Sequence, residues 1–122
     1  MFFATDIANF LACQHILTLE RAEAAGDISK RHYADPGAEL LRKLGLEHEQ
    51  KYLKELVETT GLKVVEISTD GGWSEAAVAT RVAMAAGAEA MYQATFMDGP
   101  WGGRADFSLT GGDTEQAWTM VV

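Results

Sequence analysis

The feature that most constrains this fold is a change in the hydrophobic pattern at Gly61. Before Gly61, apolar residues recur at helical spacing over two long segments. After it, most segments are rich in β-branched residues or alternate between apolar and polar positions. The pattern predicts an α/β fold, with helices packed on a small mixed or antiparallel sheet. A chain of 122 residues is long enough to bury one core, so we expect a single domain spanning 1–122.

Two helices are predicted in the first half. The first runs from about Asp6 to Ala25 and ends at Gly26. The second begins at Asp35-Pro36, where a capping side chain precedes a proline at the first helical position, and ends at Gly61. Its predicted inward face carries one histidine among apolar residues: Leu40, Leu41, Leu44, His48, Tyr52 and Leu56.

The second half is predicted to hold one more helix and several strands. The expected order is a strand at 62–67, a helix at 75–86, and then strands at 88–97, 101–109 and 117–122. The last three strands form an antiparallel meander whose first turn is at Asp98-Gly99. No turn residues follow the last strand, so we expect a truncated domain. The unfinished sheet edge would favour self-association.

Charge and cysteine content exclude several classes of protein. The net charge of −8 argues against a free-standing basic nucleic-acid-binding module and against an anionic membrane surface as the main partner. A single cysteine excludes an intrachain disulfide framework and predicts a reducing, cytoplasmic location. No apolar run reaches the roughly 18 residues of a membrane span.

The candidate metal ligands are His48 and Asp106. His48 lies on the predicted apolar face, where a histidine is often a core residue. Asp106 lies in a segment of strand composition, where aspartate is disfavoured, and an ion pair with Arg104 would account for it structurally. A helix histidine facing a strand aspartate would also supply two ligands for Mg²⁺ or Mn²⁺.

Other possible sites have ordinary structural explanations. Cys13, His15 and His32 lack the paired spacing of a zinc site. The glycines after residue 98 do not open a helix, which excludes a phosphate-binding loop. Most glutamates, Glu49 among them, lie among lysines and arginines at helical spacing, which is typical of a solvated helix face.

Three short motifs, in order, resemble RecB-like nucleases of the PD-(D/E)xK superfamily. They are TDIANFLACQH at 5–15, GLEHE at 45–49, and the pair YQA at 92–94 with GRADF at 103–107. The resemblance implies a restriction-endonuclease-like core and metal-dependent cleavage of DNA. It also implies that His48 is a metal ligand, that Asp106 is the first catalytic carboxylate, and that the metal is Mg²⁺ or Mn²⁺.

The chain departs from this family where the next motif is expected. The family carries an acidic residue, one further residue and a lysine on the next strand, whereas the segment WTMVV at 118–122 is followed by neither. We therefore expect an incomplete core, a fragment without nuclease activity, and weak binding to DNA. The resemblance further implies a helicase or an RNase H-like domain in the parent protein.

Two alternatives remain. The first is a non-catalytic interaction or scaffold domain, in which His48 is a core residue and Asp106 is ion-paired. The second is an iron–sulfur nuclease of the CRISPR-adaptation type. Cys13 matches the early cysteine of that group, but no late cysteine follows it, which argues against an iron–sulfur cluster.

Overall fold

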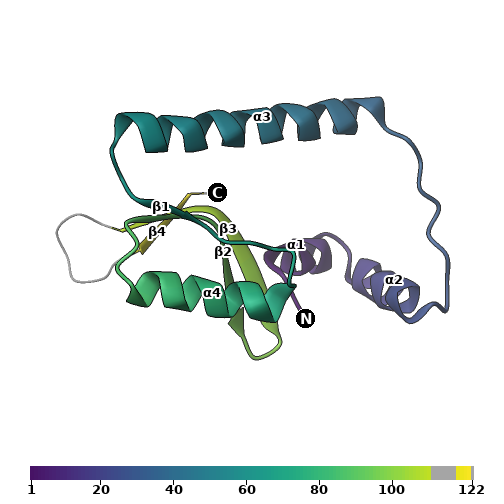
Figure 1. Cartoon of the computed structure of the whole chain (residues 1–122). Helices are drawn as coiled ribbons and strands as arrows, with labels where there is room; N and C mark the ends of the chain where they lie inside the picture. Colours follow the sequence, from purple (N-terminus) through teal and green to yellow (C-terminus); the bar gives the residue numbers. More distant parts are fainter. Residues whose placement is uncertain (111–117, 122) are drawn as a thin grey trace.

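The protein is a mixed α/β structure in which two helices lie on opposite sides of a twisted sheet (Figure 1). The computed structural model describes residues 1–110 and 118–121. The elements in chain order are α1 (Ala4–Ala12), α2 (Gln14–Ala25), α3 (Pro36–Thr59), β1 (Val64–Glu66), α4 (Trp73–Ala85), β2 (Ala90–Asp98), β3 (Trp101–Thr110) and β4 (Trp118–Val121). The predicted fold class is confirmed at this level.

The described strands follow the spatial order β1-β2-β3-β4. β1 is parallel to β2, and the other neighbours are antiparallel, so the predicted meander is confirmed. The β2–β3 turn differs from the prediction by one residue. Asp98 pairs with Trp101, which leaves Gly99 and Pro100 as the two-residue loop. Gly99 has φ 54°, and the primed turns of tight hairpins need such a residue at their first central position.

The first predicted helix is interrupted. α1 ends at Ala12, Cys13 is extended with φ −162° and ψ 112°, and α2 begins at Gln14. The prediction of one continuous helix was wrong because neither glycine nor proline marks this break. Its predicted end is confirmed, since Gly26 caps α2 in the left-handed conformation with φ 82°.

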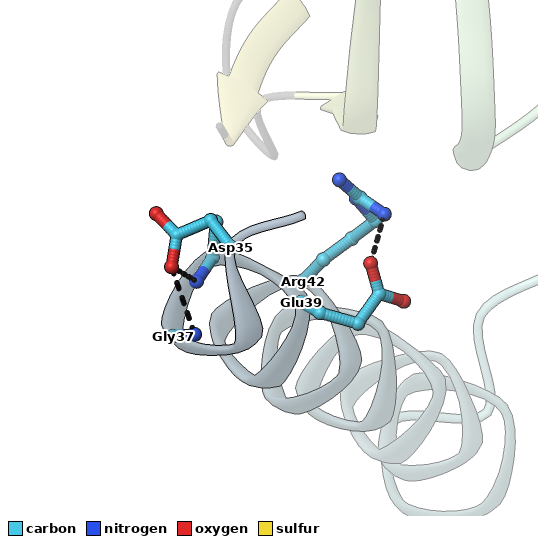
Figure 2. A network of polar contacts seen from close by, with 5 residues as sticks. Asp35, Gly37, Glu39 and Arg42 are labelled. Atoms are coloured by element: carbon cyan, nitrogen blue, oxygen red, sulfur yellow. Dashed lines mark hydrogen bonds and ion pairs between the residues drawn. The ribbon is translucent and has the colours of Figure 1, made fainter. Parts of the chain in front are cut away.

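A local sequence signal defines the start of α3. The Asp35 carboxylate accepts hydrogen bonds from the backbone N–H groups of Gly37 (2.9 Å) and Ala38 (3.2 Å), and Pro36 occupies the first helical position. Figure 2 shows this cap together with the Arg42–Glu39 ion pair one turn later. The capping bonds satisfy N–H groups that have no partner inside the helix.

The main core lies between α4 and the sheet. Its buried members are mostly small residues, which let the helix approach the strands closely: Ile67, Ala76, Ala83, Ala88, Met91 and Ala94. Fully buried Thr80 joins the two layers. Its hydroxyl donates to the Ala76 carbonyl (2.8 Å) and accepts from the Thr95 backbone N–H (2.9 Å).

Helix α3 packs less closely than its sequence predicted. Leu56 is buried and Tyr52 is half-buried, as expected of inward positions. Leu40, Leu41, Leu44 and His48 are all exposed, so the predicted inward face is wrong for the first half of the helix. The physical reason is that only the second half of α3 lies over the strands (Figure 1).

Candidate functional site

Asp106 lies on β3, the returning strand of the β2–β3 hairpin, and is half-buried. Its Oδ1 accepts a long hydrogen bond from Gln93 Nε2 on β2 (3.4 Å). The expected structural partner, Arg104, instead donates to the Thr95 hydroxyl (3.2 Å) and places its guanidinium over the Trp73 ring. Within 1–110, Asp106 is therefore not held by an ion pair with Arg104.

Gln93 distorts β2 directly opposite this carboxylate. Its φ is 61°, and it is the one non-glycine residue with positive φ in the described chain. A regular strand points successive side chains to opposite faces, yet Met91 and Ala94, three residues apart, both belong to the core under α4. The left-handed residue between them explains this switch. Such a conformation costs about 1–2 kcal/mol, and such strain is often found at functional sites.

Tyr92 connects this region to α3. Its hydroxyl donates to Glu49 Oε2 (3.1 Å) and accepts from Gln50 Nε2 (3.3 Å). Burial, followed by the hydrogen bond and negative charge of Glu49, raises the pKa of Tyr92 above 10.0. A contact with Gln93 lowers that pKa, and the charge of Asp106 raises it. Of these two carboxylates, Glu49 is hydrogen-bonded to the Tyr92 hydroxyl, whereas Asp106 influences its pKa only through its charge.

Aromatic packing fixes the position of Tyr92. The Phe107 ring lies 5.1 Å from the Tyr92 ring and 4.6 Å from the Tyr52 ring, centre to centre. Phe107 is buried and precedes Ser108 on β3, while Tyr52 comes from α3 one turn after Glu49. The same contacts that attach α3 to the sheet thus orient Glu49 toward the strands.

The structure brings Glu49, not His48, to the sheet. Successive residues of a helix point about 100° apart, so these two neighbours cannot both face the strands. Glu49 is half-buried, whereas His48 is exposed, and the prediction of an inward His48 is wrong. The role of His48 as a metal ligand stays a prediction. Glu49 was assigned to the solvated face because it lies among charged residues, although it precedes Tyr52 and Leu56 at helical spacing.

A groove of about 440 Å³ runs beside this cluster, between α3 and β1. Its charged lining consists of Lys54, Glu58 and Glu66, and Lys54 lies 4.0 Å from Glu58. One lysine against two glutamates does not attract phosphate, so this groove is a poor candidate for a nucleic-acid track.

The donors around Tyr92 have the chemistry of a hard-cation site but are few. Carboxylate oxygens are the ligands that Mg²⁺ and Mn²⁺ prefer. Within the described residues, no three side chains from His, Cys, Asp and Glu gather closely enough to hold a metal ion. Glu49 and Asp106 therefore form at most part of a coordination shell.

None of the described helices combines the length and the apolar content that crossing a membrane requires. No family model, curated protein or solved structure matches this sequence.

Proposed function

We propose that this chain is the N-terminal portion of a metal-dependent DNA nuclease of the RecB-like class, with a restriction-endonuclease-like core. One observation carries the proposal: Glu49 on α3 is hydrogen-bonded to Tyr92 on β2, next to the distorted residue Gln93, whose side chain contacts the Asp106 carboxylate on β3. The family resemblance of residues 45–49 and 103–107 names these same two segments.

Each side chain has a definite part in this proposal. Asp106 and Glu49 provide oxygen ligands, and Tyr92 holds the Glu49 carboxylate in place by its hydrogen bond. His48, the ligand that the family resemblance implies, is exposed one residue before Glu49, and it would serve as an additional nitrogen ligand only if this part of α3 turned toward the sheet. A bound Mg²⁺ or Mn²⁺ would polarise the scissile phosphate and activate water.

The 122 residues lack part of this machinery. No lysine follows Lys63, so the acidic-x-Lys motif of the family is not among them. Such a lysine would stabilise charge on the phosphate, and removing one contact of this kind typically costs ~10²–10³ in rate. We therefore propose that this chain alone does not cleave DNA. A helicase or an RNase H-like domain in the parent protein, and a cytoplasmic location, remain parts of the proposal.

Mn²⁺-induced broadening of NMR signals tests the site without requiring activity. Mn²⁺ is expected to broaden the signals of Glu49, Tyr92 and Asp106 first. Asp106→Asn and Glu49→Gln should each reduce this broadening, because each removes one charged oxygen ligand. Glu47→Gln is the matched control, since Glu47 is exposed on the same helix and lies 3.9 Å from Lys43. Broadening that survives Asp106→Asn, or that Glu47→Gln reduces equally, would contradict the site.

A cleavage assay in Mg²⁺ and Mn²⁺ tests the reaction itself. Single- and double-stranded DNA are incubated with this chain and with a version extended by the codons that follow Val122. We expect cleavage from the extended version alone, and expect it to be lost with Asp106→Asn. Cleavage by the 122-residue chain that survives His48→Ala and Asp106→Asn would refute the proposed catalytic residues.

A non-catalytic interaction domain is the second candidate, and a specific observation favours it. The first half of α3 exposes a row of leucines, with Leu40, Leu41 and Leu44 each more than half accessible. An interaction domain would use this row and would not respond to Mn²⁺, so the NMR experiment separates the two functions.

A further inference from the structure

The N-terminal segment attaches to the far end of the β2–β3 hairpin. The Phe2 backbone N–H donates to the Pro100 carbonyl (2.7 Å), and the Gly102 N–H donates to the Phe2 carbonyl (2.8 Å). These bonds form a parallel bridge between Phe2 and Trp101. In an extended segment, neighbouring side chains point to opposite sides, so Phe2 and Phe3 contact different surroundings.

Each of these phenylalanines belongs to a small cluster that also contains one tryptophan ring and one arginine guanidinium. Phe2 lies 5.4 Å from the Trp101 ring, and the guanidinium carbon of Arg21 lies 5.1 Å from the Phe2 ring centre. Phe3 lies 4.8 Å from the Trp73 ring, whose face Arg104 covers at 4.5 Å. In the described residues, no carboxylate oxygen lies within 4.0 Å of either guanidinium. Both positive charges are therefore held by aromatic faces rather than by acids.

One of the two clusters is open to a ligand. Trp101 is 47% exposed, whereas Trp73 is half-buried and covered by Arg104. A hollow of about 220 Å³ lies beside Trp101, and its lining is almost wholly apolar: Phe2, Asp6, Ile7, Phe10, Leu17 and Trp101. Asp6 provides the one carboxylate in this lining, and its Oδ2 accepts the Phe3 backbone N–H (2.7 Å).

We propose that Trp101 and this hollow bind a nucleobase of single-stranded nucleic acid, with Arg21 contacting the adjoining phosphate. A base presents an apolar π-face to stack on an aromatic ring, and its phosphate complements an unpaired guanidinium. Nearby Glu20 forms no ion pair with Arg21 in the described residues, and its Oε1 accepts from the Asn9 amide instead (3.2 Å). Base faces inside a duplex are covered by their neighbours, so the ligand is a single strand.

The proposal names the substrate class of the proposed nuclease and rests on that function. Trp101 and Asp106 lie five residues apart on β3, which corresponds to roughly 17 Å of extended strand. A few nucleotides would span this distance. Trp101 would therefore hold the single-stranded nucleic acid at a point removed from the carboxylates of Glu49 and Asp106.

Fluorescence anisotropy of a labelled oligothymidine in EDTA and low salt tests the proposal. We expect single-strand binding that exceeds binding of the matched duplex. Trp101→Ala should weaken it about 5- to 150-fold, the effect of losing one stacked base. Trp101→Phe should retain much of the affinity, and Leu19→Ala, which removes another exposed apolar side chain, should retain all of it. Arg21→Gln should lower the slope of log affinity against log salt by about 0.7.

The metal-free design separates this proposal from the catalytic one. Asp106→Asn should reduce Mn²⁺ binding and leave oligothymidine binding in EDTA unchanged. Single-strand affinity that is insensitive to Trp101→Ala would overturn the stacking proposal. A second outcome would also overturn the stacking proposal: the wild-type chain binds no single strand and self-associates, and Trp101→Ala abolishes the self-association. The surface around Trp101 would then be a protein-binding surface.

Discussion

The two helices that lie on opposite sides of the sheet, α4 and α3, are held in different ways (Figure 1). α4 has 13 residues, of which Ala76, Ala77, Thr80 and Ala83 are buried. α3 has 24 residues, and Leu56 is the one buried member. The longer helix contributes less to the core, so helix length and helix packing are separate properties of this chain.

The difference follows from the side chains. The alanines of α4 let its backbone approach the strands, so its stability comes from tertiary packing. α3 instead carries ion pairs along its own surface, between residues four apart: Lys43–Glu47, Lys51–Glu55 and Lys54–Glu58. Each such pair adds about 0.2–0.5 kcal/mol to a helix. These pairs support α3 only weakly, because their side chains are exposed and 3.9–4.0 Å apart. The main polar contact of α3 with the sheet is at Tyr92.

The largest expected difference between the two helices is in the cost of shortening an apolar side chain. Met91→Ala removes a fully buried side chain from the core under α4 and should cost about 2–5 kcal/mol of unfolding free energy. Leu44→Ala, on the exposed half of α3, should change it by less than about 0.5 kcal/mol. Denaturant unfolding measures both values. If the two substitutions lower the free energy of unfolding equally, Leu44 is buried in solution, which contradicts its exposed position on α3.

The next largest effect concerns the hydrogen bond that fixes α4 to β2. Thr80→Val keeps the shape of the side chain but leaves the buried Thr95 backbone N–H without its acceptor. We expect a loss of about 1–3 kcal/mol. Ser108→Ala is a useful contrast, because the buried Ser108 hydroxyl has no hydrogen-bond partner among the described residues. A smaller loss for Thr80→Val than for Ser108→Ala would contradict this account of the α4 contact.

Sequence alone predicted what local chemistry determines. Asp35-Pro36 and Gly61 correctly bounded α3, because a cap and a helix-ending glycine act on their immediate neighbours. The inward face of α3 was wrong for its first half, because burial depends on where the sheet lies. The break at Cys13 has no glycine or proline to mark it.

The candidate site was predicted only in part. Asp106 was a candidate because aspartate is disfavoured on a strand and because GRADF at 103–107 resembles a nuclease motif, and its role as a ligand stays a prediction. Glu49 was missed because it lies between His48 and Gln50 in a charged segment, and its hydrogen bond to Tyr92 depends on tertiary packing. The positive φ of Gln93 has no local signature either, since glutamine has no preference for that conformation.

The strain at Gln93 can be measured with two substitutions that both remove its side-chain contacts. Gln93→Gly should be about 1–2 kcal/mol more stable than Gln93→Ala, because glycine adopts a φ of 61° without steric cost. Both proteins are compared by denaturant unfolding under the same conditions. If the alanine variant is equally stable, β2 is not strained, and the functional interpretation of this residue loses its support.

The polar contact between α3 and the sheet predicts a pH effect. The pKa of Tyr92 is raised in the folded chain, so above pH 10.0 the unfolded chain loses this proton first. The contribution of the Tyr92 proton to the free energy of unfolding is therefore constant below pH 10.0. It falls as the pH rises from there toward the pKa of Tyr92 in the folded chain. Tyr92→Phe should flatten this fall, and Tyr33→Phe should not, because Tyr33 is 81% exposed. Glu49→Gln should move the tyrosinate absorbance change to lower pH, and an unchanged titration would contradict the hydrogen bond to Tyr92.

The smallest effect tests whether α3 unfolds together with the rest of the protein. Gly45 lies inside α3, and a Cβ built there meets no atom within 4 Å. Gly45→Ala should therefore stabilise the protein by about 0.5–1 kcal/mol, because alanine loses less backbone entropy on folding.

Gly61→Ala is the matched control, since its Cβ also meets open space but its φ is 65°. Alanine is strained at that angle, so this variant should lose stability where Gly45→Ala gains it. Both are measured by denaturant unfolding and by amide hydrogen exchange of α3. If Gly45→Ala slows exchange within α3 and leaves global unfolding unchanged, α3 opens independently of the α4 core. Glu49 would then face Tyr92 for only part of the time, and a ligand bound at the two carboxylates would have to hold α3 against the sheet.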